Sequence, residues 1–206
     1  MARYTGPRRR IVRRLGTVLS GLTRKTPEDR PYPPGQHGPT RVGRRSRVSE
    51  YGVRLSEKQK LRYYYGLSEV QLRNYVRRAS GATGPTGELL LETLERRLDN
   101  VVFRLGLAPT IPAARQLVVH GHVLLNGRRT TVPGLEVSAG DVIAMAERSR
   151  GHPLVREGVK RGPELALPSY LERAPDGLGG RVTGDPQRQD VPIDLRESLV
   201  IEFYAR

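Results

Sequence analysis

The sequence predicts an α+β fold: a basic N-terminal arm, a small helical domain, and a second domain in which two helices pack on a small, mostly antiparallel sheet, with a strand at the C-terminus. Three observations predict this fold. Proline and glycine crowd the first 50 residues, apolar residues then repeat at helical spacing, and a hairpin signal follows the helices. We expect the arm at 1–50, the helical domain at 51–93 joined by 196–206, and the second domain at 94–195.

The arm combines basic residues with residues that favour turns. RRRIVRR at 8–14 is long enough for one or two helical turns. RPYPPGQHGPTRVGRRSR at 30–47 cannot be regular, because its four prolines lack a backbone donor and its three glycines leave the chain loose. A disordered tail and an arm that lies on nucleic acid are the two interpretations. The charge favours the arm, since it needs a partner.

The helical domain is predicted from two capping boxes. SEKQ at 56–59 predicts a helix that begins there and ends near Gly66, and SEVQ at 68–71 predicts the next one. The second helix carries an apolar stripe. Arg73 and Arg77 lie one turn apart on another face of it, which leaves them available to a partner.

Two helices open the second domain. Leucine and valine repeat every three or four residues from Glu88 to Leu105, which predicts one long helix. The next helix begins at Thr110, a favourable N-cap with proline two residues later. It ends at His120, before Gly121, the residue type that tolerates a left-handed helix end.

Short strands follow the helices. VLLNGRRTTV at 123–132 predicts a hairpin joined by Asn-Gly, the strongest short hairpin signal. Another strand is expected within 138–145, and weaker ones near 169–173 and 180–183. SLVIEFYA at 198–205 is rich in β-branched and aromatic residues, so it predicts the C-terminal strand.

Composition narrows the class of protein. The chain has 206 residues, of which 36% are hydrophobic, enough for a modest core in one large or two small domains. It has no cysteine, which excludes disulfides and thiolate-bound zinc and fits a cytoplasmic protein. No run of about 18 apolar residues occurs, so no membrane span is expected. We expect no metal, cofactor or small-molecule substrate.

The charge is concentrated in the first two-fifths of the chain. Residues 1–80 hold 20 Lys and Arg against 5 Asp and Glu, whereas residues 81–206 hold 16 of each. The whole net charge of +15 therefore lies before residue 81. Seventeen of these cations are arginine, whose guanidinium binds phosphate through two nitrogens and stacks on bases. This pattern predicts a nucleic-acid partner.

His120 and His122 suggest a metal or catalytic site at first sight. Gly121 ends a helix between them, so their directions are set by a helix end rather than by a shared ligand. No third ligand is close in the sequence. We expect the histidines to be secondary, as RNA contacts or as surface residues, and the nearby arginines to be the functional groups.

The residues from Arg96 to Ala146 carry a resemblance. RLDNVVFRLGL, ARQLV..GHVLLNGR and V..GDVI resemble the alpha-L RNA-binding module, which we expect within 96–158. Several RNA-modifying enzymes and a tRNA synthetase family share that module. By itself the module implies RNA binding and nothing narrower.

The remainder of the chain narrows the resemblance. The opening MARY.GP.....RR.G, the central PPGQHG, SEYGVRL.EKQKLR..YG and LRNY, and the closing LVIEFYAR are similar to the family of bacterial small-subunit ribosomal protein four. The match runs from residue 2 to residue 206.

That resemblance implies a structural role in the small ribosomal subunit. It implies a primary binder of 16S ribosomal RNA that nucleates assembly of the 30S body. It also implies contact with small-subunit protein five, a role in translational accuracy with proteins five and twelve, and a place near the mRNA entry channel.

The chain departs from the family pattern in two places. Some members carry an N-terminal zinc site, whereas Arg9 and Val12 stand at the cysteine positions here, so the cysteine-free type is expected. The module's second helix usually has a basic residue after its N-cap. Ile111 and Pro112 occupy that place, so Arg115 is expected to carry more of the RNA contact.

Two alternatives remain. Arg97-Leu98-Asp99 superficially matches the catalytic aspartate of pseudouridine synthases, but Leu98 belongs to the apolar stripe of a helix and no further catalytic constellation accompanies it. A free RNA chaperone or translational repressor could use the same module. Co-sedimentation with small ribosomal subunits would separate that regulator from a ribosomal protein.

The candidate RNA-binding residues form three groups, and phosphate and shape recognition is their expected mode. The arm contributes Arg3, Arg8, Arg9, Arg10, Arg13, Arg14, Arg44, Arg45 and Arg47. The helical platform contributes Arg54, Lys58, Lys60, Arg62, Arg73 and Arg77. The module contributes Arg115, Arg128 and Arg129.

Overall fold

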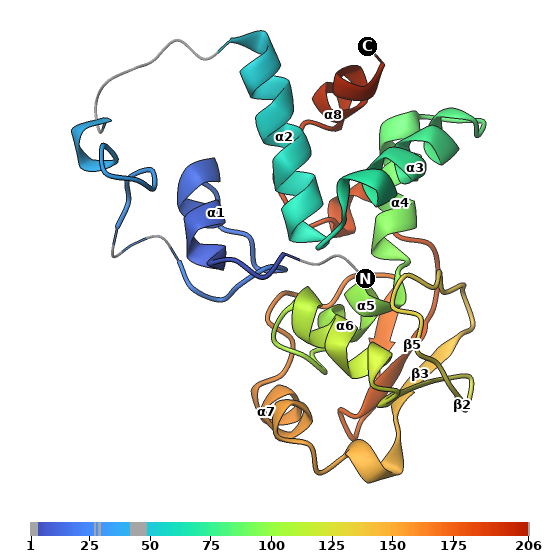
Figure 1. The fold of residues 1–206 in the computed structure, drawn as a ribbon. Helices are drawn as coiled ribbons and strands as arrows, with labels where there is room; N and C mark the ends of the chain where they lie inside the picture. The colour runs from blue at the N-terminus through green and yellow to red at the C-terminus, as the bar shows by residue number, and fades with distance from the viewer. Residues whose placement is uncertain (1–3, 27, 29, 42–48, 206) are drawn as a thin grey trace. The chain divides into compact units, whose positions relative to one another are not determined.

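The computed structural model describes residues 4–26, 28, 30–41 and 49–205 (Figure 1). It divides into two compact units, Met1–Gly87 with Ile193–Arg206, and Glu88–Pro192. Within the described residues, eight α-helices and one five-stranded antiparallel sheet confirm the α+β class. The α-helices are α1 (Arg8–Leu15), α2 (Glu50–Tyr64), α3 (Glu69–Ser80), α4 (Thr86–Glu95), α5 (Leu98–Arg104), α6 (Ile111–Val119), α7 (Pro153–Arg161) and α8 (Glu197–Tyr204).

In the first unit, α2 starts earlier than its sequence suggests. Its N-cap is Ser49, whose hydroxyl accepts a hydrogen bond from the Gly52 amide at 3.2 Å. The expected start at Ser56 was wrong, because that serine lies in the middle of a helix that is already capped. Gly52 and Val53, both weak helix formers, lie in the first turns and hide the true start.

The capping box of α3 is confirmed. Ser68 accepts from the Gln71 amide at 3.2 Å, and the Ser68 amide donates to Gln71 Oε1 at 3.0 Å. The buried side chains of Leu72 and Val76 form the apolar stripe expected for this helix. The opposite face stays exposed, which leaves it available to a partner.

The expected C-terminal strand was wrong, since Glu197–Tyr204 is the helix α8. It packs on α2 and α3, with Val200 fully buried (Figure 1). A strand needs a neighbouring edge for its backbone hydrogen bonds, and the described residues of this unit contain no strand to supply one. A helix satisfies these groups internally, so tertiary context overrides the β propensity of the segment.

In the second unit, the long helix expected from Glu88 to Leu105 is broken into α4 and α5. Arg97 has extended backbone between them, with φ −68° and ψ 135°. The amides at the start of α5 bond to a loop instead of to the preceding turn: the Leu98 amide donates to Leu135 O at 2.8 Å and the Asp99 amide to Pro133 O at 3.0 Å. The apolar spacing continues across the break, which is why periodicity missed it.

The helix α6 and the hairpin after it match their local signals. Thr110 caps α6, and Gly121 follows it with φ 70°. Asn126 and Gly127 form the hairpin turn with φ of 50° and 76°, as a type I′ turn requires. These predictions depend only on neighbouring residues, and the structure confirms them.

The sheet has the strand order β2-β1-β3-β5-β4. Its strands are β1 (Val123–Leu125), β2 (Arg128–Arg129), β3 (Val142–Met145), β4 (Leu171–Arg173) and β5 (Gly179–Val182). Figure 1 shows α5 and α6 together beside it, and the two helices pack against each other. Val123, Ile143 and Met145 are buried in this core.

The helix α7 has no counterpart in the sequence predictions. It begins after His152, its N-cap, with Pro153 in the first turn. Gly158 faces the backbone of Gly106 and Leu107 so closely that a Cβ there would collide. Glycine in mid-helix lowers helix propensity, so sequence patterns did not predict this helix, although close packing requires the glycine.

Short 3-10 turns lie at Pro39–Arg41 (η1), Glu147–Ser149 (η2) and Arg188–Asp190 (η3).

Candidate nucleic-acid interface

The helix α1 presents some arginines and uses others to hold its neighbours. Ile11 and Val12 are buried, while Arg10 and Arg14 are exposed. Arg13 donates to Tyr32 O at 3.0 Å and stacks over the Tyr32 ring at 4.7 Å.

Other arm arginines are less open or are not placed. Arg8 donates to Leu22 O at 3.3 Å, and Arg9 is half-buried. The remaining predicted arm residues lie outside the described residues: Arg3, Arg44, Arg45 and Arg47.

All four predicted cations on α2 lie within 4 Å of carboxylates: Arg54, Lys58, Lys60 and Arg62. Lys58 Nζ lies 3.0 Å from Glu69 Oε1, and its side chain is only 6% exposed. Arg54 Nε lies 2.8 Å from Glu202 Oε2, and this carboxylate raises the pKa of the guanidinium. Arg54, Lys58 and Arg62 join α2 to α3 or α8, whereas Lys60 pairs with Glu57 inside α2. The charge of all four is therefore already balanced within the unit.

Arg73 and Arg77 of α3 differ from the cations on α2. Both are exposed, and neither forms an ion pair within the described part of the chain. They line a groove of about 740 Å³ between α3 and α8. Their charge is therefore available to an anion from outside.

The residues of α2 and α8 that line this groove include aromatic side chains and the Arg54–Glu202 ion pair. Phe203 lies there with Tyr51, the two ring centres being 5.7 Å apart. Tyr51 is 60% exposed, which is high for an aromatic side chain. The groove is thus lined both by two guanidinium groups without ion pairs among the described residues and by an exposed aromatic ring.

Glu69 is the carboxylate through which α3 is bonded to α2 and α8. It accepts hydrogen bonds from Tyr204 at 2.7 Å and from Lys58 at 3.0 Å. Burial by itself would raise the pKa of Glu69, but these hydrogen bonds outweigh it and the pKa lies below its ordinary value. Burial, and then the bond to Glu69, raise the pKa of Tyr204. The pair is therefore a carboxylate bound by a neutral phenol.

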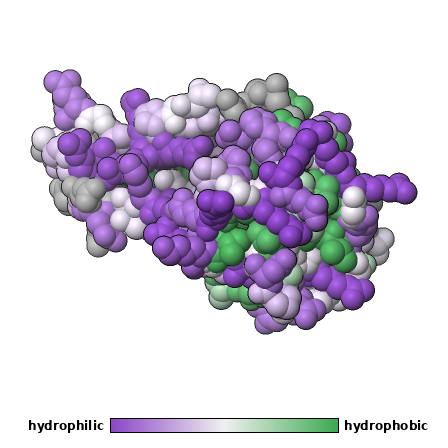
Figure 2. All heavy atoms as spheres, turned by 90° about the horizontal axis from the view of Figure 1, so that it is seen from below, coloured by the Kyte–Doolittle hydropathy of each residue, from purple (hydrophilic) through white to green (hydrophobic). Residues whose placement is uncertain are grey.

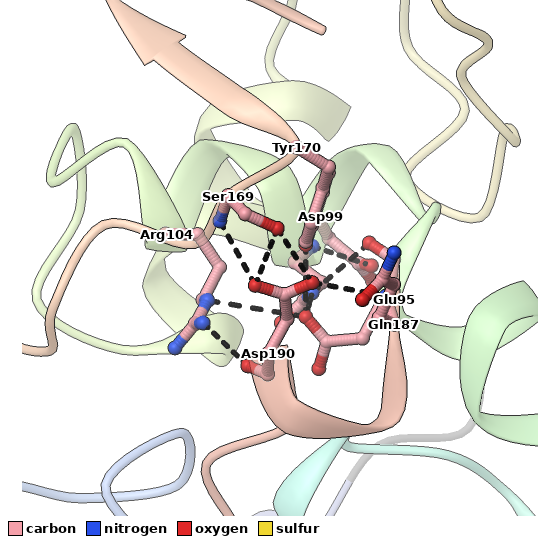
Figure 3. A network of polar contacts seen from close by, with 8 residues as sticks. Glu95, Asp99, Arg104, Ser169, Tyr170, Gln187 and Asp190 are labelled. Atoms are coloured by element: carbon pink, nitrogen blue, oxygen red, sulfur yellow. Dashed lines mark hydrogen bonds and ion pairs between the residues drawn. The ribbon is translucent and has the colours of Figure 1, made fainter. Parts of the chain in front are cut away.

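A buried polar network holds together several segments of the second unit (Figure 3). Glu95 accepts from the Tyr170 hydroxyl at 2.9 Å and from Asn100 Nδ2 at 2.8 Å. Arg104 Nη2 donates to Asp190 O at 2.7 Å. Burial raises the pKa of Tyr170 well above its usual value, so it stays a donor. The network ties Tyr170 to α4 and Asp190 to α5, across 75 and 86 residues of the chain.

The Asp190 carboxylate fixes the η3 turn to the start of β4. It accepts from the Ser169 amide at 2.8 Å and from the Gln187 amide at 2.9 Å. Burial would raise the pKa of Asp190, but these amides outweigh it and the pKa is lowered. Backbone amides thus satisfy the hydrogen-bonding needs of the carboxylate, whose role is to hold the fold.

Asp99 lies in the first turn of α5, directly after the break between α4 and α5. Arg97 holds it through two hydrogen bonds, of 3.0 and 2.7 Å, and the carboxylate has no exposed surface. Arg115 Nη1 adds a contact of 3.5 Å from α6. Burial raises the pKa of Asp99 against the influence of both guanidinium groups. Arg115, predicted to carry RNA contact, is thus tied to a buried acid, with 15% of its side chain exposed.

The hairpin places the other two predicted arginines of the module on the surface. Arg128 and Arg129 are both exposed on β2. Arg129 Nη2 donates to His120 O at 3.3 Å and lies against Gly121, where a Cβ would collide with the guanidinium. Gly121 is therefore needed both for its positive φ and for the seat of Arg129.

The hydrophilic character of the surface is consistent with a polar binding partner. On the face drawn in Figure 2, hydrophilic residues predominate and hydrophobic ones gather in a few patches. No helix among the described residues has the length and apolar character to cross a membrane. The described residues also contain no group of three or more His, Asp or Glu that could hold a metal ion.

Comparison with known proteins places this geometry in a family. The model for the Ribosomal protein S4/S9 N-terminal domain matches residues 3–95, and the S4 domain matches residues 96–143. The small ribosomal subunit protein uS4 of Thermosynechococcus vestitus is 55% identical over 206 residues, covering 100% of this chain and 99% of that protein. Those of Nostoc punctiforme and Acaryochloris marina are each 52% identical with the same coverage.

The chain belongs to the uS4 family. Its resemblance to small-subunit ribosomal protein four is thereby confirmed, and the S4 domain covers α5, α6 and the hairpin. The exposed arginines Arg73 and Arg77 fall in the N-terminal family domain, whereas Arg128 and Arg129 fall in the S4 domain. Each uS4 domain thus has its own exposed arginine pair.

Membership of the uS4 family also bears on the enzyme alternative. The relatives are named as ribosomal proteins, and Asp99 is sealed in an ion pair where a catalytic carboxylate would need access to substrate. The aspartate in the Arg-Leu-Asp context is accounted for by the fold.

Sequence reasoning missed two groups that the structure exposes. Tyr51 lies in the α3–α8 groove, and Arg148 lies on η2 near the histidines. The run Arg148-Ser-Arg150 was a local signal for the second group. Tyr51 had no such signal, because its neighbour Phe203 is far away in sequence.

Proposed function

We propose that this chain is a structural constituent of the small ribosomal subunit, in the cytoplasm, that binds 16S ribosomal RNA. One observation carries the proposal: the exposed arginines of α3 and the hairpin lie in a chain whose full length matches proteins named for the small ribosomal subunit. An enzymatic role has no open catalytic group to support it at Asp99.

Binding would use phosphate contacts at fixed spacing. Arg73 and Arg77 are one helical turn apart, and Arg128 and Arg129 sit on a rigid hairpin. Guanidinium groups held in place bind backbone phosphates and recognise the shape of folded RNA, whose base edges are poorly accessible. The exposed arm residues Arg10 and Arg14 would add further contacts, as would the arm arginines outside the described residues.

The paired cations would support this surface from behind. Arg54, Lys58, Lys60 and Arg62 already meet carboxylates, and Arg115 meets Asp99. We propose that they orient α2, α3 and α6 instead of binding phosphate directly. The RNA-binding set is thereby narrower than the charge of the sequence suggests.

The finer role follows from the family resemblance. We propose that the chain binds 16S RNA early and nucleates assembly of the 30S body. It would contact small-subunit protein five, act with proteins five and twelve in translational accuracy, and lie near the mRNA entry channel.

The test is a comparison of two charge reversals in the full chain. Arg73→Glu with Arg77→Glu should weaken binding to 16S RNA by about tenfold or more. The slope of log affinity against log salt concentration should become shallower by about 1.8, because each of the two lost phosphate contacts contributes about 0.9. Lys160→Glu with Arg161→Glu changes the same number of exposed charges at the end of α7. This control should weaken binding much less.

Equal losses in the two variants would contradict a defined surface. Co-sedimentation then separates a ribosomal protein from a free regulator: the wild-type chain should travel with small subunits in about 0.1 M salt, where nonspecific electrostatic binding has weakened. A chain that stays in the soluble fraction would contradict the ribosomal role.

A further inference from the structure

Three of the four histidines of the chain meet at one place in the second unit. His120 follows α6, His122 leads into β1, and His152 precedes α7. The ring centres of His120 and His122 are 6.0 Å apart, and those of His122 and His152 are 5.3 Å apart. Thirty residues separate the second pair in sequence, so the fold alone brings them together.

Two of these rings use one nitrogen to hold the fold. His122 Nδ1 lies 2.8 Å from the Ser149 hydroxyl, and His152 Nδ1 accepts from the Leu154 amide at 3.2 Å. In neither ring does Nε2 have a hydrogen-bond partner among the described residues. Each ring is thus held at one nitrogen and leaves the other for a ligand.

The two rings differ in what protonation would cost. His152 Nδ1 must stay unprotonated to accept from Leu154, so neutral His152 carries its proton on Nε2 as a fixed donor. The Ser149 hydroxyl can rotate to donate to His122 Nδ1 or to accept from it. His122 can therefore gain a proton without losing a hydrogen bond.

Two imidazoles and two guanidinium groups surround His122. Burial lowers its pKa first, and then His152, His120, Arg148 and Arg129 lower it further, in that order. Arg129 comes from β2 and Arg148 from η2, and both are exposed. The acid on η2 is Glu147, which is exposed and is not among the groups that shift the pKa most. This arrangement of side chains favours an anionic ligand.

We propose that the imidazole–guanidinium cluster, defined as His120, His122, His152, Arg129 and Arg148, binds a backbone phosphate of RNA and takes up a proton at His122 when it does so. The inference rests on the proposed RNA binding. Phosphate would accept from His152 Nε2–H and from the guanidinium groups, and its charge would offset the burial and the repulsion that oppose protonation of His122. Proton uptake on binding makes affinity rise as pH falls.

The test measures affinity of the full chain for 16S RNA between pH 5.5 and 8 at constant ionic strength. A single linked proton changes affinity by at most about tenfold per pH unit. We expect wild-type binding to weaken several-fold from pH 6 to 8. His122→Gln should remove most of this slope. His37→Gln, at the exposed histidine of the arm, is the matched control and should keep the slope.

A second variant keeps the proposal testable if His122→Gln fails to fold. Arg148→Gln removes a cation that opposes protonation, so the pH dependence should persist with its midpoint at higher pH. The same slope in wild type and a folded His122→Gln variant would overturn the site, as would an unmoved midpoint in Arg148→Gln.

Nuclear magnetic resonance separates this inference from the proposed function. Inorganic phosphate added to the free chain should shift the ring resonances of His122 and His152 and raise the pKa of His122, while His37 serves as an internal reference. Absent shifts would overturn the site even if RNA binds. Phosphate shifts without 16S RNA binding at any pH would overturn the proposed function and leave the anion site standing.

Discussion

The two units use the same residue type for opposite purposes. In the first unit, Arg73 and Arg77 stand unpaired on α3 beside a groove. In the second unit, Arg97 and Arg104 are buried and hold carboxylate and carbonyl oxygens. An arginine count therefore locates RNA affinity only after the buried and paired guanidinium groups are set aside.

The energetic difference has a simple physical origin. A buried charge has lost its water, so it must keep its partner, whereas an exposed one costs little to leave unpaired. Removing the carboxylate from a buried pair of the second unit, such as Arg97–Asp99, should therefore destabilise the fold. The exposed guanidinium groups of Arg73 and Arg77 can stay open for a ligand.

The largest expected effect comes from breaking a buried pair. Asp99→Ala leaves Arg97 buried without its carboxylate, and should lower the free energy of unfolding by about 3–5 kcal/mol. Denaturant titration followed by circular dichroism measures it. Asp185→Ala is the control, because Asp185 pairs with Arg96 but is 67% exposed, and should change stability by less than about 1 kcal/mol. Similar losses of stability in the two variants would contradict the distinction between buried and exposed ion pairs.

A smaller effect should separate paired from unpaired cations within the first unit. Lys58→Met removes one partner of Glu69 and should lower the free energy of unfolding by about 1 kcal/mol, with little change in RNA affinity. Arg77→Gln should leave the free energy of unfolding unchanged. RNA affinity should fall several-fold, and its slope against log salt concentration should become shallower by about 1. Thermal unfolding and salt-dependent binding of both variants measure this. A loss of affinity in Lys58→Met that equals the loss in Arg77→Gln would mean that Lys58 reaches RNA.

The smallest expected effect is a pH dependence at Glu69. Its pKa is lower in the folded chain than its ordinary value of 4.5, so the carboxylate stabilises the fold above that pH. This contribution is lost as pH falls through the folded pKa. Glu69→Gln should therefore lose less stability than wild type between pH 5 and 3, measured by denaturant titration at each pH. Parallel curves for the two proteins would show that Glu69 does not carry this dependence.

Local signals in the sequence were sufficient for several elements. The capping box at Ser68, the N-cap at Thr110 and the Asn126-Gly127 turn all appear where they were predicted. Each depends on hydrogen bonds or φ angles within a few residues. The helix break at Arg97 was missed because its cause is a loop about 35 residues later in the chain.

The candidate site divides in the same way. Arg73 and Arg77 were predicted on an exposed face of one helix, and helical spacing alone places them there. Lys58 and Arg115 were predicted in the same set, yet their carboxylates come from other elements. Charge in a sequence shows how many cations exist, but not which ones already have a partner.

By itself the sequence determined the family, the α+β class, the helix and hairpin ends of the S4 domain, and the concentration of charge before residue 81. Only the tertiary structure decided that the C-terminal segment is a helix, which arginines stay unpaired, and that three histidines share one surface. The first set depends on contacts between near neighbours in the chain. The second depends on contacts between residues far apart in sequence, which form only when the chain has folded.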